Sequence, residues 1–336
     1  MMDMVFLYAS MGLCGNTINF RKMWRWPRQK GRETMQKKPG YLSRFKRQWQ
    51  YHLMLLPGVV LVLIFSYIPL YGLIMAFEKY NPALGFNSPW IGLGNFTYLF
   101  KQPNFLKTIW NTFYIAVFKI LGGIIVPVIF ALLLNEIKAS GVKKLFQTLV
   151  YMPHFLSWVI LAGVLMDLLS ADGLINQILL SLGLRGMNFL GDPKIFPWTM
   201  IISDIWKSFG FGTVVYLAAL TSIDPGLYEA AIMDGASRWK QTTYITIPML
   251  MPTIVLMTIL SIGNILNAGF DQVYNLYSPI VYSTGDIIDT YVYRLGIEQA
   301  QYAVGTAVGL FKSLVSGALI CISYYMADKF AGYRVF

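Results

Sequence analysis

The sequence predicts an all-α integral membrane protein with six transmembrane helices. Of its 336 residues, 56% are hydrophobic and only 13% are charged, whereas soluble domains carry about 25% charged residues. The apolar residues form runs longer than about 18 residues, and such runs cross about 30 Å of hydrocarbon as helices. Lys and Arg gather beside these runs, as the positive-inside rule expects. Lipid is therefore the solvent for most of this chain.

The first three predicted spans are apolar runs with few or no charged residues. The first carries no charge, the second is interrupted only by Lys119, and the third is short, with Pro153 near its start. Each is rich enough in apolar residues to favour helix in hydrocarbon over exposure to water. The predicted spans are Leu53–Phe77, Ile109–Leu134 and Leu149–Leu165.

The last three spans differ from one another in charge. The fourth contains Asp204 and Lys207, the fifth is free of charge, and the sixth contains Lys312. Six spans place both chain ends on the same side of the membrane. The predicted spans are Phe196–Leu220, Met249–Phe270 and Ala303–Met326.

The distribution of Lys and Arg predicts which side that is. Eleven of the 27 basic residues lie in Arg21–Arg47, before the first span. With the N-terminus inside, the inner segments hold 18 basic residues and the outer segments hold 6. This bias predicts cytoplasmic N- and C-termini. Residues 1–52 are then a basic cytoplasmic extension that contacts anionic lipid. No nucleic-acid signature accompanies the net charge of +11.

The segment between the fourth and fifth spans is polar and strongly patterned. Residues 229–252 read EAAIMDGASRWKQTTYITIPMLMP. Asp224 and Pro225 before them suit a helix start, with Asp as N-cap and Pro at the first helical position. Gly235 permits a tight bend, and Pro248 marks the entry into the next span. The pattern predicts a short helix, a turn and a second short helix on the cytoplasmic side.

This segment resembles the EAA loop of permease subunits in binding-protein-dependent ATP-binding-cassette importers. The resemblance implies a coupling helix that seats in a groove of a separate ATPase. It also implies the type I ABC importer permease fold, with a five-helix core at 108–326, a coupling loop at 222–252 and a cytoplasmic tail at 327–336. The positions that match the motif are Glu229, Ala230, Ala231, Asp234, Gly235, Ala236, Pro248 and Pro252.

A second resemblance covers the first span and the loop that completes residues 53–107. YIPLYGLIMAF from Tyr67, SPWIGLGNF from Ser88 and IIDTYVY from Ile287 are similar to LplB-type permeases of the carbohydrate-uptake group. This implies oligosaccharide import in a bacterial plasma membrane, in some relatives of acidic alginate or pectin fragments. It also implies three partners: a second homologous permease subunit, an ATPase dimer and an extracellular solute-binding protein.

Motifs for catalysis are missing from the sequence. It contains no GxxxxGK[ST] phosphate loop, so we expect ATP and Mg to be bound by the partner ATPase and not by this chain. There is likewise no HExxH, GxSxG or CxxC motif, and no catalytic or metal site is predicted. The chain by itself is not expected to be an enzyme.

Ionisable residues within spans are costly and usually face protein or water. Asp204 and Lys207 lie three apart on one helix face, so they can pair with each other, whereas Lys119 and Lys312 have no such neighbour in their own helices. In one interpretation the lysines tie helices together through carbonyls or through an acid of a partner subunit. In the other they line a wet cavity of net charge +2 that suits a carboxylated saccharide.

Sugar handling also favours aromatic faces and amide groups, although such residues are more often ordinary packing. The candidate pathway residues are Lys119, Trp158, Asp204, Trp206, Lys207, Tyr216, Asn264, Asn267, Gln272 and Lys312.

Two other classes of function remain open from the sequence alone. An ion-coupled secondary transporter would need no ATPase and would be expected to show inverted repeats. A membrane scaffold could dock an ATPase without transporting anything. Uptake into proteoliposomes separates all three, because ATP dependence excludes the first alternative and transport itself excludes the second.

Overall fold

The computed structural model describes residues 48–263 and 265–331, and all regular secondary-structure elements of the described chain are helices. Within those ranges the only strand-type pairings are two isolated bridges, Glu78 with Trp90 and Asn81 with Gly85. The prediction of an all-α fold is therefore confirmed.

Contacts divide the chain into two units, Met1–Ser66 and Tyr67–Phe336. The described part of the first unit is α2 (Trp49–Val62), which contains Pro57, and most of a π-helical turn at Leu63–Tyr67. The division falls inside one continuous helical run, the predicted first span. The elements given next belong to the second unit.

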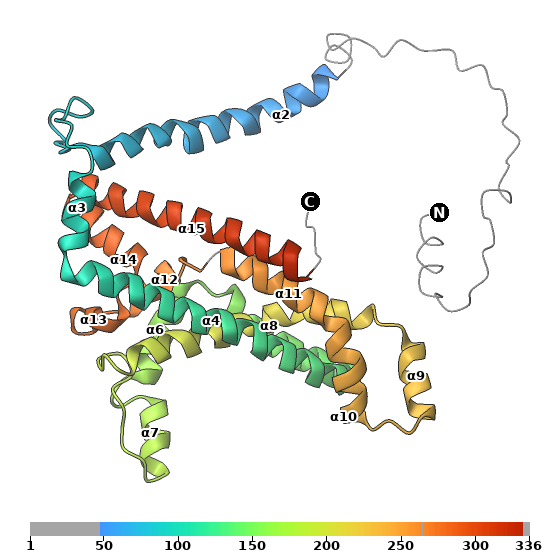
Figure 1. The fold of residues 1–336 in the computed structure, drawn as a ribbon. Coiled ribbons are helices and arrows are strands. Elements are labelled where there is room, and N and C mark those ends of the chain that lie inside the picture. Colours follow the sequence, from blue (N-terminus) through green and yellow to red (C-terminus); the bar gives the residue numbers. More distant parts are fainter. Residues whose placement is uncertain (1–47, 264, 332–336) are drawn as a thin grey trace, which may run out of the picture. The chain divides into compact units, whose positions relative to one another are not determined.

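The second unit contains long helices joined by short helical pieces, and Figure 1 shows their order. Its elements are η3 Ile68–Phe77, α3 Gly94–Lys101, α4 Pro103–Glu136, α5 Ser140–Tyr151, η4 Met152–Phe155, α6 Trp158–Leu169, α7 Leu174–Ser181, α8 Phe196–Thr221, α9 Pro225–Met233, α10 Arg238–Gln241, η5 Thr242–Thr246, α11 Ile247–Gly263, α12 Phe270–Leu276, η6 Pro279–Val281, α13 Tyr282–Gly285, α14 Ile288–Tyr293, η7 Arg294–Glu298 and α15 Tyr302–Ala331.

Within the described residues, five helical segments are long and apolar enough to cross a membrane. The 26-residue α8 is not among them. It holds Asp204 and Lys207 in its middle, and these two charges lower its mean hydropathy. The five segments are Trp49–Phe77, Pro103–Glu136, Trp158–Ser181, Arg238–Gly263 and Tyr302–Ser323.

Two of the predicted spans have different bounds in the structure. Leu149–Leu165 is not one helix, because the chain turns through η4 between α5 and α6. Pro153 lies in that turn, where it cannot donate the backbone hydrogen bond that a continuous helix requires. The predicted fifth span is also too long: α11 ends at Gly263, and α12 begins at Phe270.

Glycines allow the central helices to approach closely. A side chain at Gly122 of α4 would meet Ile205 Cδ1 of α8 at 2.0 Å, and one at Gly210 of α8 would meet the carbonyl oxygen of Val150 at 2.3 Å. Helix α4 accordingly packs along α8, and α5 packs against α8. The absence of a Cβ at both positions therefore sets the spacing of the three helices.

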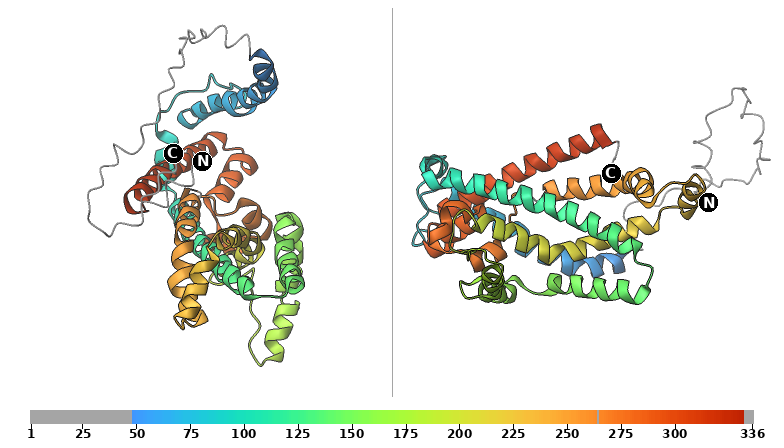
Figure 2. Two further views of the ribbon diagram at one scale, coloured as in Figure 1. Left: turned by 90° about the vertical axis from the view of Figure 1, so that its right-hand side faces the viewer. Right: turned by 90° about the horizontal axis from the view of Figure 1, so that it is seen from below.

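The two ends of the second unit differ in what they contain. Helices α9 and α10 lie together at one end, and α3, α13 and α14 lie at the other (Figures 1 and 2). The larger apolar core joins residues of α4, α6, α8, α12, α14 and α15. A smaller core stands next to α9 and consists of Ala131, Tyr216, Leu220, Ile223 and Leu250.

Candidate functional site

Residues 224–248 form a helical hairpin, here called the polar hairpin. Its first helix begins where Asp224 Oδ1 accepts a hydrogen bond from Gly226 N at 2.9 Å. Its second helix begins where Ser237 Oγ accepts one from Lys240 N at 3.4 Å. Both are N-caps that satisfy donors of the first helical turn. The predicted sequence of short helix, turn and short helix is confirmed.

The turn between the two helices depends on Gly235. Its φ of +73° lies in the left-handed region, and its N–H donates to the carbonyl of Ile232 at 3.0 Å. Ala236 N donates to Ala231 O at 2.9 Å. Together these bonds form a Schellman motif, which closes the end of α9. The geometry of the turn is therefore fixed locally, by the backbone of this hairpin.

One contact links the two arms of the polar hairpin, and two others hold it against neighbouring helices. Tyr228 Oη and Thr246 Oγ1 are 2.9 Å apart and link its two arms. Arg238 Nη1 donates to Glu136 Oε2 at 2.9 Å, at the end of α4. The smaller apolar core packs Tyr228 and Ile245 against α4 and α8. Movement of the hairpin would therefore be transmitted to α4, α8 and α11.

The polar hairpin also presents large apolar side chains to its surroundings. Ile232, Met233, Trp239 and Tyr244 are 61%, 87%, 76% and 79% exposed. These side chains are free to contact another molecule. The eight positions predicted to couple to an ATPase lie in or directly after this hairpin; six are exposed, and Ala231 and Ala236 are half-buried: Glu229, Ala230, Ala231, Asp234, Gly235, Ala236, Pro248 and Pro252.

A cavity of about 380 Å³ lies between α4, α8 and the end of α11. Three of the predicted pathway residues line it: Lys119, Asp204 and Asn267. Ser261 and the backbone of Gly269 complete its polar lining. The structure thus brings together charges and amides that lie up to 150 residues apart in the sequence.

Lys119 lines this cavity, and its residue is 9% exposed. Its ammonium donates to Ala268 O at 2.7 Å and to Gln272 Oε1, and lies 3.7 Å from Asp204 Oδ1. Gln272 in turn donates from Nε2 to Met200 O at 2.8 Å. The lysine therefore joins α4, α8 and α12, and its buried charge is hydrogen-bonded as such charges must be.

A second ion pair joins Lys312 of α15 to Asp289 of α14. The same ammonium donates to Asn267 Oδ1 at 2.7 Å, in the segment between α11 and α12. The sequence did not single out Asp289, because it lies in the predicted outer loop. Of the four charged residues in the predicted wet cavity, Lys119 and Asp204 line the cavity of about 380 Å³, whereas Lys207 and Lys312 are not among its lining residues.

Lys207 occupies a different position from the one that its spacing suggested. In the described chain the ion pair of Asp204 is with Lys119. The Lys207 ammonium instead donates to the carbonyl of His154 at 3.0 Å and lies 5.3 Å from the centre of the Trp158 ring. Lys207 is 9% exposed, and no acidic side chain of the described residues pairs with it. Within the described part of the chain it is thus a buried ammonium without a carboxylate partner.

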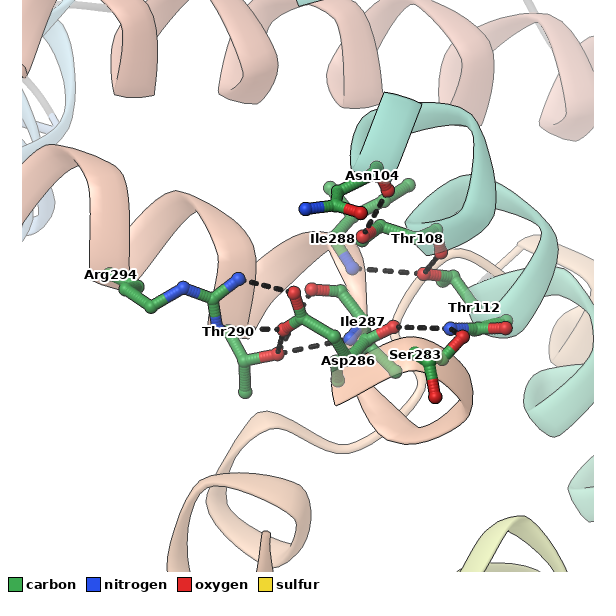
Figure 3. Close-up of polar contacts among 10 residues, drawn as sticks. Asn104, Thr108, Thr112, Ser283, Asp286, Ile287, Ile288, Thr290 and Arg294 are labelled. Atoms are coloured by element: carbon green, nitrogen blue, oxygen red, sulfur yellow. Dashed lines mark hydrogen bonds and ion pairs between the residues drawn. The ribbon is translucent and has the colours of Figure 1, made fainter. Parts of the chain in front are cut away.

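A polar network fixes the short helices near the far end of α4, as Figure 3 shows. Arg294 forms an ion pair with Asp286, and Thr290 Oγ1 donates to Asp286 Oδ1 at 2.7 Å. Ile288 N donates to Thr112 Oγ1 of α4 at 2.9 Å. Burial disfavours the charge on Arg294, but Asp286 outweighs that effect and holds the pKa of Arg294 above its ordinary value. The network holds α14, which carries Asp289, against α4.

The remaining predicted pathway residues are scattered. Trp206 lines a separate apolar pocket of about 320 Å³, and Tyr216 is buried in the smaller core beside the polar hairpin. Gln272 is fully buried behind Lys119, and Asn264 lies outside the described residues. Among the residues that the structure describes, no group of three or more His, Cys, Asp or Glu side chains could hold a metal ion.

Ser261 and Asp289 contribute polar groups to this region that sequence reasoning missed. Ser261 lies in the charge-free fifth span, where hydropathy shows no polar site. Its helical spacing from Asn264 and Asn267 could have indicated a shared face. No sequence signal pairs Asp289 with Lys312, because α14 and α15 meet only in the folded chain.

Comparison with known proteins identifies the family. Residues 123–331 match the model of the binding-protein-dependent transport system inner membrane component. Protein LplB of Bacillus subtilis is 42% identical over 292 residues, which are 86% of this chain and 92% of LplB. The polygalacturonan/rhamnogalacturonan transport system permease protein YteP of the same organism is 41% identical over 297 residues, 88% of this chain and 92% of its own.

A solved structure has the same fold. A chain in the crystal structure of a bacterial ABC transporter involved in the import of the acidic polysaccharide alginate aligns with a TM-score of 0.80 and 40% identity, over 86% of this chain and 98% of that one. The expected likeness to LplB-type permeases and the expected permease fold are thereby confirmed. The chain belongs to the family of binding-protein-dependent transport system inner membrane components, the permease subunits of ABC importers.

Proposed function

We propose that this chain is one of two permease subunits of an ATP-driven importer for acidic oligosaccharides. The names of its relatives support this substrate class, since one acts on polygalacturonan and rhamnogalacturonan and another on alginate. All three are polymers that contain uronic acids. The substrate then carries carboxylates at regular intervals along a sugar chain.

The single observation that supports an acidic substrate is the environment of Lys207. It is a buried ammonium without an acidic partner in the described part of the chain, and an uncompensated buried charge is unfavourable unless another group neutralises it. A substrate carboxylate would do so. The Trp158 ring next to the ammonium offers an aromatic face on which a sugar ring can stack.

The proposed assembly has four kinds of subunit. This chain pairs with a second homologous permease subunit, two copies of an ATPase bind ATP and Mg below them, and an extracellular solute-binding protein delivers the saccharide. The exposed apolar side chains of the polar hairpin support docking to the ATPase. When nucleotide closes the ATPase dimer, the hairpin would move with the ATPase subunit to which it is bound. Its contacts with α4, α8 and α11 would then move these helices as well.

The proposed topology has six spans with both chain ends in the cytoplasm. Helix α8 is the additional span. Its 26 residues cover about 39 Å at 1.5 Å per residue, and its two charges face other helices of the same chain. Residues 1–52 and the polar hairpin both carry basic residues, which supports a cytoplasmic location for each of them. Residues 53–107 would precede the transport core at 108–326.

Transport by the complete importer in proteoliposomes tests this proposal. We expect uptake of oligogalacturonate to depend on ATP and on the binding protein. Lys207→Met should raise the KM for oligogalacturonate about tenfold, as the loss of one charged hydrogen bond implies, and should leave the KM for a neutral oligosaccharide of equal length unchanged. Lys144→Met, at an exposed position on α5, is the matched control. Equal effects on both sugars would refute the acidic class.

A further inference from the structure

A groove of about 660 Å³ lies at the end of the second unit opposite the polar hairpin. It is formed by the first turns of α4, the first turns of α8 and the helix α13, and we call it the outer groove. Its principal side chains are Leu106, Lys107, Trp110, Lys194, Pro197 and Trp198.

Two polar side chains in the wall of the outer groove, Asn111 and Thr284, are already hydrogen-bonded within the chain. Asn111 Nδ2 donates to the carbonyls of Ser283 and Asp286, each at 3.3 Å. Thr284 Oγ1 donates to the carbonyl of Pro193. The two ammonium groups of the groove, Lys107 and Lys194, have no acidic partner among the described residues. A ligand would therefore meet two cations and, besides them, chiefly the hydroxyl groups of Tyr114 and Ser283.

The rest of the outer groove is apolar and accessible. Leu106, Trp110 and Trp198 are 56%, 65% and 43% exposed. A saccharide would need several hydroxyl or amide partners to replace its bound water, and the wall offers few. A molecule with one anionic group and a long apolar body matches this surface better, because the charge meets the lysines and the apolar body meets the indole rings.

The location of the outer groove agrees with such a molecule. It lies at the first turns of the candidate span Pro103–Glu136, at the depth where Trp and Lys contact lipid headgroups. Helices α4 and α8 both begin beside it, and their dipoles add positive potential for an anion. We propose that the outer groove binds an anionic phospholipid of the outer leaflet. Its phosphate contacts Lys107 and Lys194, and an acyl chain lies along Trp110 and Trp198.

Lipid retention by the complete importer tests this proposal. The complex is assembled in nanodiscs that contain phosphatidylglycerol and phosphatidylcholine, transferred to detergent, and its bound lipids are counted by native mass spectrometry. The double variant Lys107→Gln/Lys194→Gln should bind phosphatidylglycerol about thirtyfold more weakly, since each lysine near an anionic lipid surface strengthens binding about fivefold to sixfold. Lys101→Gln, an exposed lysine on the neighbouring α3, is the matched control and should retain the lipid.

Three results would overturn the proposal. The first is equal retention of phosphatidylglycerol by the double variant and the control. The second is loss of the partner permease subunit from the double variant with unchanged lipid content, which would assign the outer groove to a subunit interface. The third is weaker binding of oligogalacturonate with unchanged lipid content, which would assign it to the saccharide. The proposal does not depend on the acidic class of the transported sugar.

Discussion

The polar hairpin and the central lysine cluster (Lys119, Asp204, Gln272, Lys312 and Asp289) use their side chains in opposite ways. The cluster completes its ion pairs and hydrogen bonds within this chain, across α4, α8, α12, α14 and α15. The hairpin completes its backbone geometry and a few side-chain contacts, such as Arg238 with Glu136, and leaves Met233 and Trp239 exposed. The cluster therefore holds helices of the permease together, whereas the hairpin leaves apolar side chains available for the proposed contact with the ATPase.

The largest expected effect concerns the turn of the polar hairpin. Proline cannot adopt the φ of +73° at Gly235, nor donate the bond to Ile232. Gly235→Pro should therefore abolish ATP-driven uptake while the protein is still inserted, and stimulation of ATP hydrolysis by sugar should be lost. Both are measured on the complete importer in proteoliposomes.

The structure offers a closely matched control for this substitution. Gly183, after α7, has φ +76°, donates to Leu180 O at 3.0 Å and has open space around it, as Gly235 does. Gly183→Pro imposes the same backbone strain away from the hairpin, so we expect uptake to continue. Normal sugar-stimulated hydrolysis in Gly235→Pro would show that the hairpin does not couple the two activities.

The second effect is on the stability of the central lysine cluster. Lys119→Met removes the partner of Asp204 and of Gln272 Oε1. Breaking a buried pair on one side costs about 3 kcal/mol, and we expect the thermal midpoint of the purified complex to fall. Lys207→Met removes one bond to a carbonyl and should lower it less. Equal midpoints for Lys119→Met and the unmodified protein would contradict the role assigned to the cluster.

The third effect is on docking at the exposed face of the polar hairpin. Trp239 is 76% exposed in this chain, so Trp239→Ala should leave folding unchanged. If the indole is buried against the ATPase, its loss should weaken association by about 2 kcal/mol, as for interface hot spots. Titration of the ATPase onto the permease pair measures this. Leu182→Ala, 69% exposed beyond α7, should have no effect on that affinity, and a similar loss in both would contradict the assignment.

The smallest effect is expected for the contact between the polar hairpin and α4. Arg238 and Glu136 form an ion pair at 2.9 Å, with side chains 70% and 53% exposed. Such pairs contribute less than about 1 kcal/mol. Arg238→Ala should therefore change the thermal midpoint little and reduce uptake modestly. Restoration of uptake in the charge-reversed pair Arg238→Glu/Glu136→Arg would support a mechanical role, and a further loss would argue against it.

Much of the fold could be predicted because its signals are local. Asp224, Pro225 and Gly235 predict the polar hairpin, and the structure contains the corresponding cap and turn. Errors occurred where a local signal was weak. The chain turns at Pro153 inside a predicted span, and α11 ends at Gly263 although apolar residues continue after it. Hydropathy measures average burial in lipid and does not report where a helix breaks.

The amino-acid sequence by itself determined the helical class, the position of the polar hairpin and the distribution of basic residues. These depend on neighbours along the chain, through hydrophobic run length, capping and turn geometry. Only the tertiary structure decided that Asp204 pairs with Lys119, that Lys312 pairs with Asp289, and that Lys207 has no acidic partner among the residues the structure describes. Helical spacing allowed a pair between Asp204 and Lys207. Because α4 packs closely on α8 at Gly122, Lys119 of α4 lies within ion-pair distance of the Asp204 carboxylate.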